Sequence, residues 1–256
     1  MSVTRGSSLG RVIATAASKA VAFLFKSYSE LHPSHRSSWS FMNAAGRSPM
    51  GDGGYDDGYS ACPCFWGQVP GSLVRDFVAA NPLLTGRTVL DLGCGEGKNA
   101  NAFALAGASV DAVDCSALAI ANGKRAFPSQ NINWITSNAA DHLRRCQTYD
   151  YVVLYGLLHC LPSAEDISEL IALAIRKTAN GGAHFLVAFN NGPHDLSAHP
   201  DFRPTLVSHA FYCEQYKRQA IISASDTVLH ETHPHNQIPH FHSITRIIAK
   251  VRDELS

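Results

Sequence analysis

Residues 89–99 read Val-Leu-Asp-Leu-Gly-Cys-Gly-Glu-Gly-Lys-Asn. An apolar run enters this stretch, glycines occupy the alternate positions Gly93, Gly95 and Gly97, and a helix-like segment follows. Glycine tolerates positive φ and carries no side chain, so a strand that turns through glycines into a helix lets its backbone approach a polar ligand closely. We therefore predict that residues 88–92 form the first strand of an α/β fold and that the glycines form a ligand-binding turn.

The glycine spacing excludes two nucleotide-binding classes. A dinucleotide fingerprint needs its third glycine three positions after the second, where this chain has Lys98. A phosphate-binding P-loop needs Gly-Lys followed by Ser or Thr, and here Gly97 and Lys98 are followed by Asn99. Neither motif is present.

The pattern from Asp91 to Gly97 resembles motif I of the class I, Rossmann-like S-adenosylmethionine-dependent methyltransferases. The resemblance covers about residues 64–251. It implies S-adenosylmethionine as cofactor and S-adenosylhomocysteine as product. It also implies a doubly wound, seven-stranded, mostly parallel sheet of order 3-2-1-4-5-7-6, with strand 7 antiparallel and helices on both faces.

An acidic residue closes the predicted second strand, residues 109–113. Asp114 lies 17 residues after Gly97, which leaves room for one helix and one strand between them. A carboxylate at this position accepts hydrogen bonds from both ribose hydroxyls of a nucleoside. Capping of the helix from Ser116 onward is a compatible second role.

Further cofactor contacts follow from the resemblance. Asn138 occupies a position where the family usually has Asp to accept from the adenine amino group, and Ala139 offers a backbone N–H. Asp141 is the alternative acceptor. The predicted cofactor-binding residues are Trp66, Asp91, Gly93, Cys94, Gly95, Gly97, Asp114, Cys115, Asn138, Ala139 and Tyr155.

The segment before the core domain, residues 62–70, carries two features. Its aromatic-Trp-Gly sequence followed by Pro looks like the same region of small-molecule methyltransferases of the tellurite-resistance type. By that resemblance Phe65 binds substrate and Trp66 lines the pocket, and core packing remains the alternative. Cys62 and Cys64 are too few thiolates for a zinc site.

Histidines supply the candidate catalytic groups. His159 follows the predicted fourth strand, at the sheet edge where α/β proteins bind ligands, and is a candidate base, with a structural role as the alternative. Residues 233–242 contain four histidines: His233, His235, His240 and His242.

A His-rich stretch joins the last two strands in the tellurite-resistance type, which implies substrate contact by His235 and His240. We predict His159, His240 and His242 as catalytic. Zinc binding and a solvated hairpin are the alternatives, but prolines interrupt the segment and it contains no carboxylate, so no metal site is predicted.

Composition limits the partners and the compartment. Lys+Arg and Asp+Glu balance at 21 each, which argues against nucleic acid, and no apolar run approaches the 18 residues of a stable membrane span. Seven scattered cysteines suit a reducing, cytoplasmic setting. The basic, Ser- and Ala-rich residues 1–30 leave a transit peptide, an interfacial helix or a packed helix open.

We predict an N-terminal extension, residues 1–60, with a helix and then a flexible Gly/Asp-rich loop, and a methyltransferase domain over residues 61–256. The predicted function is methyl transfer to a small-molecule acceptor with an O, N, S or chalcogen nucleophile. The alternatives are a non-catalytic S-adenosylmethionine-binding protein or a Cys/His metal-handling protein. A homodimer is compatible with this interpretation.

Overall fold

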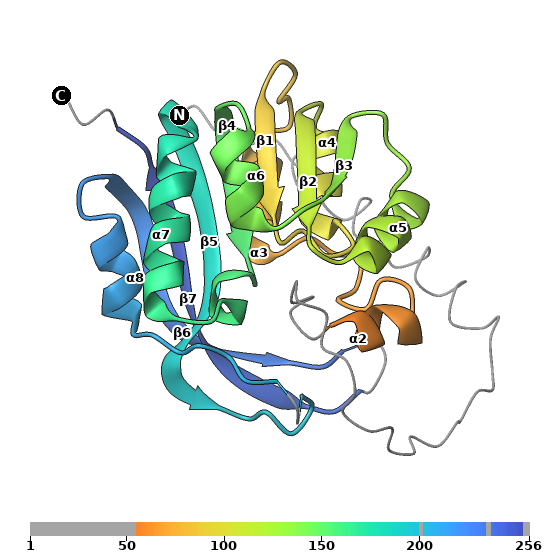
Figure 1. The fold of residues 1–256 in the computed structure, drawn as a ribbon, viewed down its shortest axis with the longest axis vertical. Coiled ribbons are helices and arrows are strands. Elements are labelled where there is room, and N and C mark those ends of the chain that lie inside the picture. Colours follow the sequence, from red (N-terminus) through yellow and green to blue (C-terminus); the bar gives the residue numbers. More distant parts are fainter. Residues whose placement is uncertain (1–54, 200–201, 234–236, 253–256) are drawn as a thin grey trace, which may run out of the picture. The chain divides into compact units, whose positions relative to one another are not determined.

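The computed structural model describes residues 55–199, 202–233 and 237–252 (Figure 1). The chain separates into two units, residues 1–46 and 47–256, and every described residue belongs to the second. Most of the predicted N-terminal extension therefore lies outside the described residues. Residues 56–58, predicted as part of a flexible loop, instead begin the helix α2 (Asp56–Ala61), which packs against α5 (Ala117–Ala126).

A seven-stranded sheet forms the centre of the domain, in the order β3-β2-β1-β4-β5-β7-β6. β7 pairs antiparallel with both β5 and β6, and the other neighbours are parallel, which confirms the predicted topology. The strands are β1 (Thr88–Leu92), β2 (Ser109–Asp114), β3 (Ile132–Thr136), β4 (Tyr149–Tyr155), β5 (Thr178–His194), β6 (Ala220–Glu231) and β7 (His240–Lys250).

Helices cover both faces of the sheet because successive strand side chains point to opposite sides. The remaining helices are α3 (Ser72–Ala80), α4 (Lys98–Leu105), α6 (Ala139–Arg145), the 3₁₀ turn η1 (Leu158–Cys160), α7 (Ala164–Arg176) and α8 (His209–Gln215). Leu90 and Leu92 join one buried cluster with α6, α7 and α8, while Val89 joins another with α3 and α4.

None of the described helices is long and apolar enough to cross a membrane.

The helix starts follow local chemistry. Ser163 caps α7 by accepting the N–H of Asp166, and Glu165 and Asp166 lie in the first turn, where the helix dipole favours acids. α4 begins two residues later than its sequence suggests, because Gly97 takes up a left-handed conformation at its N-cap.

β5 is longer than the predicted strand, residues 183–189. Its register with β4 shifts near its start, and its far end continues to His194, which pairs with His242 of β7. Figure 1 shows β5, β6 and β7 extending past the ends of the shorter parallel strands. This extension brings the C-terminal histidines close to the ligand-binding edge of the sheet.

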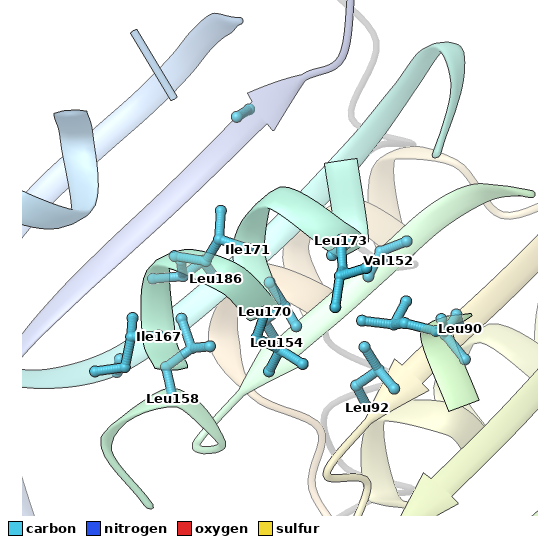
Figure 2. Packing of buried hydrophobic residues seen from close by; sticks show 14 of the residues in the cluster. Leu90, Leu92, Val152, Leu154, Leu158, Ile167, Leu170, Ile171, Leu173 and Leu186 are labelled. Atoms are coloured by element: carbon cyan, nitrogen blue, oxygen red, sulfur yellow. The ribbon is translucent and has the colours of Figure 1, made fainter. Parts of the chain in front are cut away.

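Replacing Leu154 of β4 with alanine should reduce the free energy of unfolding by about 2–5 kcal/mol, because its side chain is fully buried between the sheet and α7 (Figure 2). The measurement is urea denaturation at equilibrium. Leu105→Ala is the matched control, because Leu105 is 80% exposed and its loss should change stability by less than about 0.5 kcal/mol. Equal effects of the two changes would contradict the assigned core.

Candidate functional site

A cavity of about 560 Å³ lies at the carboxyl ends of β1, β2 and β4. Its wall combines the glycine turn with parts of α2, β5, β6 and η1. The predicted site residues found in this wall are Trp66, Gly93, Cys94, Gly95, Gly97, Asp114, Cys115, Asn138, Ala139, Tyr155 and His159. Four predicted residues are not in the wall: Phe65, Asp91, His240 and His242. His235 lies outside the described residues.

The glycine turn requires glycine for both conformation and space. Gly93 and Gly97 have φ values of +65° and +83°. A Cβ at Gly97 would lie 2.2 Å from the Trp134 ring, and one at Gly93 would lie 2.9 Å from Leu157. The bare backbone of the turn therefore faces the cavity, as a closely bound polar ligand requires.

Asp114 presents a carboxylate to the same cavity. Its Oδ2 accepts the N–H of Gly95 at 2.8 Å, and its Oδ1 accepts the N–H of Ser116 at 2.9 Å. Burial raises the pKa of Asp114, while the two N–H donors lower it. Each oxygen has lone-pair capacity beyond its backbone bond, so the group can also receive a pair of hydroxyls.

Asp91 lies behind the turn instead of in the cavity wall. Its carboxyl is 1% exposed, and its Oδ2 has no hydrogen-bond partner within the described part of the chain. Burial raises the pKa of Asp91 to about 7, an effect that the N–H of Ala100 opposes and the charge of Asp114 reinforces. Asp91 thus connects β1 to the start of α4 and lies outside the cavity wall.

The preceding segment, residues 64–71, is held by three side chains: Glu96 in the turn, and Lys98 and Asn99 at the start of α4. Glu96 Oε1 accepts the N–H of Cys64 at 2.9 Å, and Oε2 accepts that of Phe65. Lys98 Nζ donates to the Trp66 carbonyl at 2.9 Å, and Asn99 Oδ1 accepts the N–H of Gly71 at 2.8 Å. These bonds place the Trp66 side chain in the cavity wall.

Phe65 is not among the residues that line the cavity and packs in a small buried cluster. Its ring packs edge-on against Tyr59 and against Trp66, with centroid distances of 6.1 and 4.7 Å. The substrate contact predicted for Phe65 stays a prediction.

Asn138 has a role that its sequence position did not reveal. Its Oδ1 caps α6 by accepting the N–H groups of Ala140 at 2.9 Å and Asp141 at 3.3 Å. The alternative acceptor, Asp141, forms an exposed ion pair with Arg144 and is absent from the wall. The backbone N–H of Ala139, at the start of α6, remains suited to a ligand because first-turn N–H groups lack helical acceptors.

His159 is buried in the wall and held on two sides. Its Nδ1 accepts the N–H of Phe189 at 3.2 Å, and its ring stacks on the Phe189 ring at 4.1 Å. Burial, together with His242 and His194 nearby, lowers the pKa of His159 to about 3. The ring is therefore neutral with its proton on Nε2, so it offers a donor and not a free base.

The wall also contains residues that were not predicted, among them Tyr55, Tyr59, Cys160, Phe189 and Glu231. Tyr55 and Tyr59 stand four residues apart, a helical spacing that a Gly- and Asp-rich context concealed. Glu231 reaches the wall from the end of β6, and its Oε1 lies 3.8 Å from His240 Nε2 and 3.7 Å from His242 Nε2. The two histidines thus lie next to the cavity, beside Glu231.

Asp91→Asn should change how stability depends on pH. The folded-state pKa is about 7, against about 3.9 in an unfolded chain, so the folded protein holds a proton here that the unfolded chain has released. The stability that this group contributes is full below pH 4 and is lost as the pH rises toward 7. Asparagine cannot ionise and still accepts from Ala100.

Relative to wild type, the free energy of unfolding of Asp91→Asn should therefore increase between pH 4 and pH 7, by up to about 1.4 kcal/mol per pH unit. Urea denaturation at a series of pH values measures this difference. Parallel pH profiles for the two proteins would contradict the buried, protonated state assigned to Asp91.

Comparisons with known proteins agree with this fold. Residues 89–182 match the model of the methyltransferase domain family. A cypemycin N-terminal methyltransferase from Streptomyces sp. is 35% identical over 120 residues, which are 46% of this chain and 48% of that protein. The chain therefore spans about half the length of this curated relative.

Two solved structures share the fold. One, from work on the conversion of a disulfide bond into a thioacetal group during echinomycin biosynthesis, has a TM-score of 0.60 and 17% identity over 78% of this chain and 91% of that chain. The other, TehB from Haemophilus influenzae, has a TM-score of 0.56 and 21% identity over 71% and 62%. At these identities both likenesses show a shared fold.

The sheet order, the glycine turn and the family model point to the same assignment. Residues 89–182 therefore carry a methyltransferase domain, on a sheet with the Rossmann-like order of strands.

Proposed function

We propose that this chain transfers the methyl group of S-adenosylmethionine to a small-molecule acceptor and releases S-adenosylhomocysteine. The observation that carries the proposal is one continuous cavity that reaches from Asp114 and the glycine turn to Tyr55, Cys160 and Glu231. Its volume of about 560 Å³ lies within the range of roughly 300–1,000 Å³ typical of small-molecule sites.

The residues at one end of the cavity fit the cofactor. The Asp114 carboxylate would hold the ribose hydroxyls, the bare backbone at Gly93 and Gly95 would receive the amino-acid portion, and Ala139 N–H would meet the adenine ring. When bound, S-adenosylmethionine supplies an electrophilic methyl group on a sulfonium. The chain's own task is then to orient the acceptor, and orientation can contribute about 7–11 kcal/mol to catalysis.

The other end of the cavity favours an acceptor that arrives deprotonated. The Nδ1 lone pair of His159 is engaged by the Phe189 N–H, and burial raises the pKa of the Cys160 thiol to about 12. Neither group is suited to remove a proton at neutral pH. A thiolate or a chalcogen oxyanion needs no base, so these two acceptor classes fit His159 and Cys160, whereas an acceptor that must lose a proton would depend on the Glu231 carboxylate, which also lines the cavity.

Asp114→Asn should weaken the binding of S-adenosylmethionine by about 10- to 100-fold, because hydrogen bonds to a charged group contribute about 1.5–3 kcal/mol. Asparagine keeps an acceptor for Gly95 N–H, so the turn should persist. Isothermal calorimetry on the full chain measures the affinity. Asp76→Asn, on the exposed part of α3, is the matched control and should leave affinity unchanged. Equal affinities of Asp114→Asn and wild type would contradict the cofactor placement.

Turnover separates catalysis from the alternative of a non-catalytic S-adenosylmethionine-binding protein. The purified full chain is incubated with S-adenosylmethionine and a panel of thiols, chalcogen oxyanions, phenols and amines, and the release of S-adenosylhomocysteine is measured. We expect release with at least one thiol or chalcogen oxyanion. Tight cofactor binding without release across the panel would favour the non-catalytic alternative.

A further inference from the structure

A group of five metal-ligating side chains lies beside the cavity, and we call it the His/Glu cluster: His199, Glu231, His233, His240 and His242. They come from three places in the chain, namely the segment after β5, the end of β6 and the start of β7. The donor atoms of His199, His240 and His242 lie within 4.8 Å of one another, and so do those of Glu231, His233 and His240. His199 Nε2 and His233 Nε2 are 2.9 Å apart.

The hydrogen bond at His240 fixes where its proton lies. Its Nδ1 is 2.8 Å from the Ile238 carbonyl, which can only accept, so Nδ1 carries the hydrogen. In the neutral ring Nε2 then holds a bare lone pair. That nitrogen is buried and has no hydrogen-bond partner among the described residues.

Two consecutive hydrogen bonds, through His194, also place the ring proton of His242 on Nδ1. His194 Nε2 lies 2.6 Å from the Asn190 carbonyl and must donate to it, which leaves His194 Nδ1 as an acceptor in the neutral ring. His242 Nδ1, 3.3 Å away, then donates to His194 Nδ1. His242 Nε2 is therefore a second bare lone pair, likewise buried and without a partner in the described part of the chain.

Both lone pairs lie near Glu231 Oε1, at 3.8 Å from His240 Nε2 and 3.7 Å from His242 Nε2. These distances are too long for hydrogen bonds, and all three atoms are acceptors. A cation between them resolves the conflict. Zinc binds imidazole nitrogen and carboxylate oxygen at about 2.0–2.2 Å, so neighbouring ligands of a tetrahedral site lie roughly 3.3 Å apart. The observed separations from Glu231 are about 0.5 Å longer.

The surroundings have the features of a second coordination shell. Metal-bound histidines normally donate their other ring N–H to a carbonyl, carboxylate or similar acceptor, which Ile238 and the His194–Asn190 relay supply here. The Trp66 ring packs edge-on against His233 at 5.0 Å and shields that side.

The segment 233–242 alone lacks a carboxylate, and for that reason the sequence favoured no metal site. Pairing of β6 with β7 places Glu231 opposite His240, and the segment after β5 adds His199. We propose that the His/Glu cluster binds one divalent transition metal, with zinc the best match, through His240, His242, His199 and Glu231. Because Glu231 also lines the cavity, the metal borders the acceptor end of the site.

The test uses the purified full chain after removal of metal with a chelator. Titration with zinc against a chromophoric chelator should show one tight site per chain, and cobalt at the same site should give visible d–d absorption. His242→Ala should weaken zinc binding by at least about 100-fold and should abolish the rise in melting temperature that zinc causes in wild type. Glu231→Gln should weaken binding without removing side-chain volume.

His230→Ala is the matched control, because His230 is an exposed histidine beside Glu231 on β6. Its ring lies tilted against Phe241, and it has no donor atom in the cluster. It should bind zinc as wild type does. Wild type without a stoichiometric site, or equal zinc affinity in wild type, His242→Ala and Glu231→Gln, would overturn the proposal. If His242→Ala does not fold, Glu231→Gln alone decides between these outcomes.

Discussion

The hydrogen bonds from Glu96, Lys98 and Asn99 to the backbone of residues 64–71 join the two parts of the wall on which the cavity depends. The glycines around Glu96 give the turn its shape, while these three side chains determine what lies across from it. A charge-assisted hydrogen bond contributes on the order of 1.5–3 kcal/mol. The backbone of the glycine turn therefore faces the cavity. The side chains of Glu96, Lys98 and Asn99 bind residues 64–71, which include Trp66 of the cavity wall.

Lys98 and Asn99 are also the residues that distinguish this turn from two phosphate-binding motifs. Lys98 stands where a dinucleotide fingerprint has its third glycine, and Asn99 stands where a P-loop has Ser or Thr. In the folded chain both side chains bind backbone groups of residues 66 and 71. The two residues that differ from the phosphate-binding motifs are therefore also residues that hold the segment 64–71 in place.

The sheet and the cofactor end of the cavity could be predicted because their signals are local. Apolar runs mark the strands, glycines mark the turn, and Asp114 ends β2, so parallel pairing alone brings them to one edge. Tyr55, Glu231 and His199 could not be placed in this way. Their positions depend on packing of α2 and on the register of β6 with β7, which are long-range features without a local sequence signal.

The hydrogen bonds of each histidine, and not its residue type, determine whether it donates or accepts a proton at the cavity or the cluster. Density alone suggested bases for catalysis, yet His159 uses its lone pair on a backbone N–H. At His240 and His242 the Nδ1 bonds leave the Nε2 lone pairs toward Glu231. Identical side chains in one small volume therefore have opposite chemistry: one presents a donor to the cavity, and two present acceptors to a carboxylate. A cation would satisfy all three of those acceptors without a change of protonation, which is why we infer metal binding from the acceptor arrangement and not from the number of histidines.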